Sequence, residues 1–192
     1  MERRTFLAGL GSIGIAATAG CGAVAGETTL SEPTVDADSP GRKALIFESD
    51  GEEIGHVGVD GTVENGLIDL STEIWHREGT RVERIELRVW MPETESAADV
   101  AVVSPVESDS SPPPSVALYT PDSAPGTAIE ITDLDDLADE TISTLELLVR
   151  PPDAATELAI DATVELAGSG ALTQDYDLEG ELRLSYPDLD AE

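Results

Sequence analysis

Four arginines and two tryptophans occur close together in a chain that is otherwise strongly acidic. A guanidinium group binds anionic groups, and an indole ring stacks on sugars and on cations. Residues of these types at this density predict a recognition patch on the surface of the protein. The candidate patch consists of Trp75, Arg77, Arg81, Arg84, Arg88 and Trp90.

The alternation of apolar and polar residues predicts which way these side chains point. Residues 85–91 place an aliphatic or methionine side chain at every second position, so Arg84, Arg88 and Trp90 are expected to point outward. The same alternation over residues 70–75 points Trp75 outward. We therefore expect both tryptophans on the same solvent-exposed face as the arginines.

Two interpretations of this face stay open. In the first, it binds a ligand through its guanidinium and indole groups. In the second, the arginines stabilise the sheet by pairing across strands with nearby carboxylates, and the indoles cover them. The carboxylates available for that pairing are Glu73, Glu83 and Glu86.

Metal chemistry finds little support in the sequence. His56 and His76 are 20 residues apart, without the spacing of a zinc motif, and His76 is expected to end a strand. The acidic face of the last predicted hairpin could approach a cation, but neighbours on one strand are about 6.6 Å apart and calcium needs oxygens at about 2.3–2.6 Å. We expect no metal and no other cofactor, and a solvated acidic surface there.

Catalytic motifs are also missing from the sequence. It contains no Gly-x-Ser-x-Gly turn and no glycine-rich phosphate loop. A hydrolase that uses a pair of carboxylates stays open, because the chain has 40 Asp and Glu residues. We therefore expect a protein that is not an enzyme and has no catalytic residues.

The N-terminus carries the most specific pattern. Arg3 and Arg4 are followed by Phe6 and Leu7, then by a short apolar stretch that ends in Thr-Ala-Gly before Cys21. The paired arginines resemble a twin-arginine export signal, and the small residues before the cysteine resemble a lipobox, with threonine where that pattern prefers leucine.

This resemblance implies a signal peptide over residues 1–20 and a covalent diacylglyceryl lipid on Cys21, the sole cysteine of the chain. Two acyl chains are enough for a stable membrane anchor. The implied location is the cell membrane, lipid-anchored and facing the extracellular side. The alternative is an ordinary signal peptide with an incidental cysteine.

The charge is the third informative feature. The chain of 192 residues has a formal net charge of −30, from 40 acidic and 10 basic residues, and nine of its ten bases are arginines. Such a charge repels phosphates, so nucleic acid is excluded as a partner. The composition resembles that of haloarchaeal proteins, and the whole chain resembles uncharacterised haloarchaeal lipoproteins exported by the twin-arginine route.

The rest of the chain divides into a tether, a domain and a tail. Residues 21–42 have no apolar period and predict a disordered tether, and residues 188–192 an acidic tail. Residues 43–187 predict short strands separated by Gly and Pro turns, with one helical turn or two over Asp133–Glu140. The predicted strands are 43–49, 53–59, 67–76, 82–91, 100–104, 116–120, 127–132, 142–150, 157–167 and 172–186.

This pattern predicts an all-β fold. Alternation is clearest over residues 157–186, which predict a long hairpin in an antiparallel sheet with one wet face. The acidic segment before residue 142 resembles the E–F corner of immunoglobulin-like sandwiches. We expect an immunoglobulin-like antiparallel β-sandwich.

Three functions follow in order of preference. The first is a non-catalytic interaction module on the surface of a halophile, held by its lipid anchor, with a cell-surface protein or glycan as partner. The second is a solute- or glycan-binding lipoprotein that uses the Trp/Arg face. The third is an extracellular carboxylate-dependent hydrolase.

The acidic composition generates a testable prediction. Removing KCl by dialysis is expected to unfold or expand the chain, because carboxylate repulsion is screened at molar salt, where the Debye length is about 3 Å. Circular dichroism in molar and millimolar KCl measures this. Identical spectra in both would contradict the prediction.

Overall fold

The computed structural model describes residues 26–94, 98–104, 114–134, 142–152, 155–169 and 174–190. The predicted export signal with Arg3, Arg4, Phe6 and Leu7, and the predicted lipidation site Cys21, lie outside these ranges. Most of the helical segment predicted over Asp133–Glu140 also lies outside them. No helix long and apolar enough to cross a bilayer occurs in the described part of the chain.

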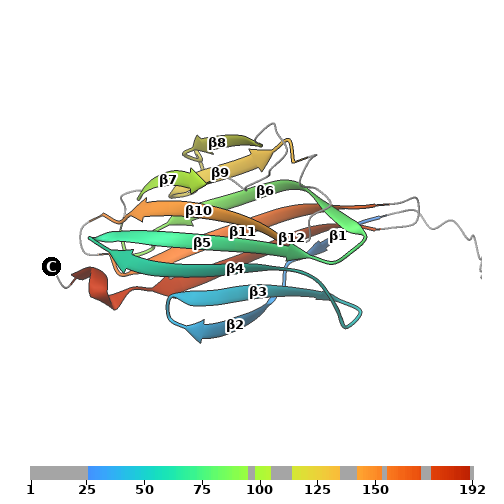
Figure 1. Ribbon diagram of the computed structural model, residues 1–192, viewed down its shortest axis with the longest axis horizontal. Helices are drawn as coiled ribbons and strands as arrows, with labels where there is room; N and C mark the ends of the chain where they lie inside the picture. Colours follow the sequence, from blue (N-terminus) through green and yellow to red (C-terminus); the bar gives the residue numbers. More distant parts are fainter. Residues whose placement is uncertain are drawn as a thin grey trace, which may run out of the picture.

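Two six-stranded sheets make up the fold (Figure 1). The first sheet has the order β1-β12-β11-β6-β9-β8, and the second has the order β2-β3-β4-β5-β10-β7. The strands are β1 Glu27–Leu30, β2 Thr34–Ser39, β3 Arg42–Ser49, β4 Glu52–Glu64, β5 Leu67–His76, β6 Thr80–Trp90, β7 Asp99–Ser104, β8 Ser115–Tyr119, β9 Thr127–Thr132, β10 Ile142–Arg150, β11 Glu157–Gly168 and β12 Asp175–Ser185, and a 3₁₀ turn, η1, covers Pro187–Asp190.

The predicted fold class, an all-β, immunoglobulin-like antiparallel β-sandwich, is confirmed. The described pairings are antiparallel apart from β1, which runs parallel to β12. The long hairpin is also confirmed, because β11 and β12 pair continuously from Glu157 opposite Ser185 to Leu166 opposite Tyr176. Alternation identified these strands because each sheet has one face in the core and one in water.

The core lies between the two sheets and is almost entirely aliphatic. The inward side chains of β6 are fully buried, as the alternation predicted. Those of β11 lie beside them in the first sheet, and those of β5 belong to the facing second sheet. Phe47 is a buried aromatic side chain in this layer. The central members from β5, β6 and β11 are Ile68, Leu70, Ile74, Ile85, Leu87, Val89, Leu158, Ile160 and Val164.

The tether predicted over residues 21–42 is wrong from Glu27 onward. β1 pairs with β12 from Glu27 opposite Asp175, and β2 pairs with β3 from Thr34 opposite Ile46. Every residue of β2 is exposed, so this edge strand shows no apolar period that a sequence could reveal. Its strand conformation comes from backbone pairing with β3 rather than from burial of its side chains.

The chain passes from one sheet to the other between β5 and β6. β5 pairs with β4 and β10, whereas β6 pairs with β9 and β11. His76 ends β5, as predicted, and is completely buried. The Thr80 hydroxyl donates to the Arg77 carbonyl (2.8 Å), so His76 Nδ1, 3.0 Å from that hydroxyl, acts as a donor to it.

The opposite end of the sandwich is closed by a tyrosine on two glycines. Gly61 N donates to Gly41 O (2.9 Å), and the ring of Tyr186 lies against both residues. The Tyr186 hydroxyl is buried and has no hydrogen-bond partner among the residues that the structure describes, and this burial raises its pKa well above the usual range. The close approach depends on the absence of a side chain at Gly61.

Gly61→Ala is therefore expected to destabilise the fold by about 1–3 kcal/mol. Its Cβ would overlap the Tyr186 hydroxyl and lie 2.7 Å from Leu70 Cδ2. Gly58→Ala on the same strand is the matched control, because its Cβ would have its nearest neighbour at 3.9 Å. Chemical denaturation at constant salt measures both, and equal stability of the two variants would contradict this account.

Candidate functional site

Arg84 lies at the centre of a charge network on the outer face of the first sheet. Its Nε donates to Glu130 Oε1 (2.7 Å), Nη2 to Glu86 Oε2 (2.8 Å) and Nη1 to Glu165 Oε1 (3.1 Å). The carboxylates come from β6, β9 and β11, and Glu165 stands directly opposite Arg84 in the strand register. The hydrogen bond that Arg84 donates to Glu165, together with the other two carboxylates, raises the pKa of Arg84. Each of its three nitrogen atoms thus donates to a carboxylate of the same domain.

Arg88 covers Trp90 rather than standing beside it. Its guanidinium carbon lies 3.8 Å from the centre of the indole ring, a cation–π contact. Asp161 on β11 forms an ion pair with Arg88, and the carbonyl of Pro125 accepts from Nη1 at 3.0 Å. Trp90 is left only 8% exposed. Its indole is therefore packed under the guanidinium and offers no open stacking surface.

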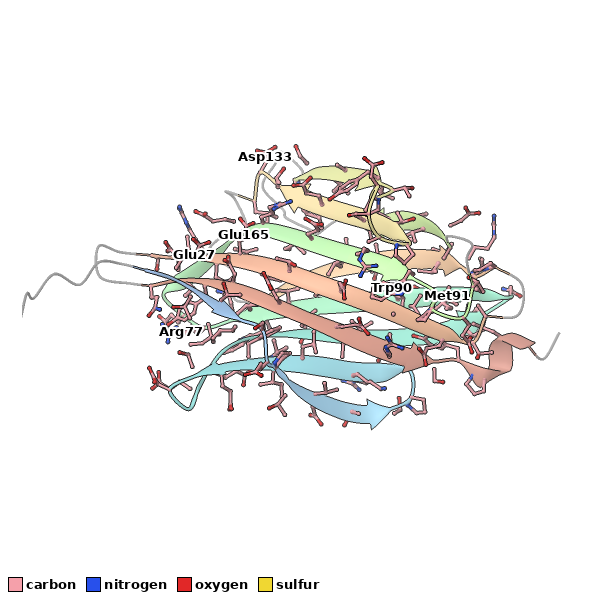
Figure 2. The ribbon with its side chains drawn as sticks, turned by 180° about the vertical axis from the view of Figure 1, so that it is seen from behind. Glu27, Arg77, Trp90, Met91, Asp133 and Glu165 are labelled. Carbon is pink, nitrogen blue, oxygen red and sulfur yellow. The ribbon has the colours of Figure 1, made fainter. Side chains whose placement is uncertain are left out.

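The other two arginines lie toward the end of the sandwich where β1 begins. Arg77 Nη2 donates to the Tyr176 hydroxyl (3.2 Å), and its guanidinium carbon lies 5.2 Å from the centre of that ring. Arg81 Nη2 donates to Glu83 Oε1 (2.9 Å). Figure 2 shows Arg77 near Glu27 at one end of the molecule and Trp90 near Met91 at the other.

Trp75 lies on a different face, which corrects the expected common face of both tryptophans. It belongs to β5 in the second sheet, and its ring stacks on His56 at a centroid distance of 5.4 Å and an angle of 17°. His56 Nδ1 lies 2.7 Å from Glu53 Oε1, and Nε2 lies 3.6 Å from Glu73 Oε1. The crossing between β5 and β6 separates this cluster from the arginines of β6 by the full thickness of the sandwich.

The structure thus divides the predicted patch into three parts. Arg84, Arg88 and Trp90 share the outer face of the first sheet, Arg77 and Arg81 lie near the end where β1 begins, and Trp75 lies on the second sheet. Pairing across strands, the second interpretation, describes Arg84 and Arg88, whose partners include carboxylates of β9 and β11. Glu83 and Glu86 do pair with arginines, but along β6 itself and not across strands, and Glu73 approaches His56.

The structure adds a hollow that sequence reasoning missed. A hollow with a volume of about 760 Å³ lies on the outer face of the second sheet. Its acidic side chains come from four strands, β2, β4, β5 and β10. Two of the residues, on β2, fall in the segment predicted as a tether, so spacing in the sequence offered no signal for the hollow. The acidic residues are Asp36, Asp38, Glu53, Asp60, Asp69, Glu73 and Glu146.

These carboxylates do not converge on a point. Within the described ranges, no group of three or more His, Cys, Asp or Glu side chains is placed to hold a metal ion. Arg42 and Lys43 also line the hollow. Arg42 Nε lies 3.7 Å from Asp38 Oδ2 and 3.8 Å from Asp60 Oδ2. The arrangement is a hydrated acidic surface with dispersed cations.

Comparison with known proteins identifies a family without a known function. A family model described as a domain of unknown function (DUF8121) matches residues 27–188, which is most of the chain and coincides with the sandwich. None of the curated proteins matches the sequence.

Solved structures with similar folds are distant in sequence. The N-terminal periplasmic domain of ScsB from Proteus mirabilis is 9% identical with a TM-score of 0.43; the match covers 73% of this chain and 49% of that one, so the chain spans about half its length. An immunoglobulin-like protein from Nocardia farcinica is 11% identical (TM-score 0.42, 67% and 97% covered). The collagen-binding domain of a Staphylococcus aureus adhesin is 8% identical (TM-score 0.40, 66% and 95% covered).

The charge network generates a prediction about stability. Arg84→Met is expected to cost roughly 1 kcal/mol, because three carboxylates on adjacent strands lose their shared cation. The loss should shrink as KCl is raised, since salt screens the remaining repulsion. Chemical denaturation at two KCl concentrations that keep the chain folded measures it.

Arg150→Met is the matched control. Arg150 Nη1 lies 3.8 Å from Asp99 Oδ2, and the two side chains are 69% and 83% exposed. Their ion pair therefore contributes almost nothing to the stability of the fold. An equal loss of stability in both variants would contradict a structural role specific to Arg84.

Proposed function

Because the chain belongs to the DUF8121 family, whose function is unknown, we propose its function from its own residues: an exported, lipid-anchored, non-catalytic interaction module on the cell surface of a halophile. The observation that carries this proposal is the pattern at the N-terminus. This pattern consists of Arg3, Arg4 and the lipobox-like residues before Cys21. Cys21 itself lies six positions before Glu27, where the first strand begins.

The short distance between anchor and domain supports a particular orientation. A segment of six residues reaches at most about 20 Å when fully extended. A lipid on Cys21 therefore holds the end of the sandwich that carries Glu27 and Arg77 close to the membrane (Figure 2). The opposite end and the long sides of the sandwich face outward, where a partner can reach them.

The arginines pair with groups of the same domain, which supports a module that stays folded at high salt concentration. Arg84 and Arg88 direct their donors to carboxylates and a carbonyl of the same domain. The other carboxylates remain at the surface, where they bind water and keep the chain soluble at high ionic strength. A solute- or glycan-binding function would use the Trp/Arg face. Because those residues are divided between two sheets, their arrangement argues against that function.

The test is export and lipidation in a haloarchaeal host. The unaltered chain is expected in the membrane fraction with a lipid on its N-terminal peptide, as measured by mass spectrometry. Cys21→Ser is expected to release a folded protein, and replacing both Arg3 and Arg4 with lysine is expected to block export. Arg150→Lys, a distant arginine, is the control.

Retention of Cys21→Ser in the membrane fraction after an alkaline wash would contradict a lipid anchor at this residue. Unchanged export of the double lysine variant would contradict the twin-arginine route.

A further inference from the structure

The four edges of the two sheets differ in how they are protected from pairing with another strand. An edge strand presents unpaired backbone groups, and proteins usually guard it with charged side chains. β2 carries Asp36 and Asp38, and β1 is four residues long and begins with Glu27. β8, the edge of the first sheet, carries no charged side chain.

The absence of charge extends beyond β8 in the sequence. No Asp, Glu, Lys or Arg occurs from Ser110 to Pro121, the longest such run between Glu27 and the C-terminus. β7, the edge of the second sheet on the same side of the sandwich, carries one charged side chain, Asp99 at its first residue (Figure 1). We call the side of the sandwich formed by β7 and β8 the β7–β8 flank.

This flank also exposes apolar side chains. Of the five large apolar residues that are clearly exposed in the described part of the chain, Val103 on β7 and Leu118 and Tyr119 on β8 lie here, at 60%, 45% and 40%. The other two are Ile142 at the start of β10, the neighbour of β7, and Val35 on the charged edge β2. Among the described residues β8 has no strand on its outer side, and exposed apolar groups beside such an edge are typical of an interaction surface.

We infer that the partner of this flank is a second copy of the chain, joined by antiparallel pairing of β8 with β8. Two copies that each carry a net charge of −30 repel each other wherever their acidic faces meet. β8 carries no charged side chain, so this repulsion is smallest there, and a two-fold axis at the centre of β8 brings like residues together without bringing like charges of the strand together. Ala117 is the middle residue of β8 and lies beside that axis.

The pairing has a geometric consequence. β8 runs along the long axis of the molecule (Figure 1). Glu27 lies toward one end of that axis and η1 at the other (Figures 1 and 2). An antiparallel β8 pair therefore sets the Glu27 ends of the two copies at opposite ends of the dimer. If both copies carry the anchor proposed above, the dimer joins two facing membranes rather than two neighbours in one membrane; this consequence rests on the proposed function, whereas the dimer does not.

The dimer is tested with the full chain carrying Cys21→Ser, which removes the lipidation site. Light scattering in molar KCl is expected to give twice the monomer mass of 20.1 kDa at high protein concentration. Leu118→Glu is expected to give the monomer mass, because it places two carboxylates near the two-fold axis. Val35→Glu, on the charged edge β2, is the matched control and should stay dimeric.

A monomer at every concentration, or equal dissociation in the two glutamate variants, would overturn the inference. Circular dichroism confirms that each variant is folded, and a second variant covers the case in which Leu118→Glu unfolds. Because Cys21 is the sole cysteine, Ala117→Cys in the Cys21→Ser chain has a single thiol. Antiparallel pairing puts the two Cα atoms about 4.5–5.5 Å apart, within disulfide range.

Mild oxidation is expected to cross-link the Ala117→Cys chain completely and leave Ala37→Cys, its counterpart on β2, largely uncrosslinked. Equal cross-linking of the two would overturn pairing at β8. For the membrane consequence, the lipidated chain is placed in vesicles made of the host's polar lipids. Clustering of the vesicles that Leu118→Glu abolishes supports the antiparallel arrangement, and a dimer without clustering contradicts it.

Discussion

The passage of the chain from the second sheet to the first, over the three residues between His76 and Thr80, governs the arrangement of the molecule. Both flanking side chains are buried, and the hydroxyl of Thr80 bridges the His76 ring and the Arg77 carbonyl. β5 belongs to the second sheet and β6 to the first, so the two strands face each other across the core instead of pairing in one hairpin. The outer faces of the two strands then point in opposite directions, and the polar residues of each strand belong to separate surfaces.

The two outer faces use charge differently as a result. On the first sheet, Arg84 and Arg88 sit among carboxylates of β6, β9 and β11, so that negative charge is neutralised locally. On the second sheet, carboxylates from four strands surround a shallow hollow with fewer cations. Screening by concentrated salt matters most for that second face, because Arg42 approaches its carboxylates only at 3.7–3.8 Å. The β7–β8 flank, whose strands carry a single charged side chain, Asp99, is a third kind of surface between them.

Sequence alternation predicted the strands well and their partners poorly. The bounds of β5, β9 and β10 agree residue by residue, because one face of each strand is buried and the period of two is visible locally. Which strands pair depends on residues that are far apart in the sequence. The turn residues Glu78-Gly79 fit a hairpin and a connection between two sheets equally well, so they did not distinguish the two. The pairing of Arg84 with Glu130 and Glu165 joins residues 46 and 81 positions apart, which no single sequence could reveal.

Backbone NMR contacts in molar KCl test the crossing most directly. The structure predicts cross-strand contacts of Leu87 with Ala162 and Ile129, and of Ile74 with Val57 and Ser143. Those two sets place β6 in one sheet and β5 in the other. Observation of both sets, with no regular ladder between β5 and β6, is the predicted result. A continuous antiparallel ladder joining β5 to β6 would contradict it, because the arginines and Trp75 would then share one face.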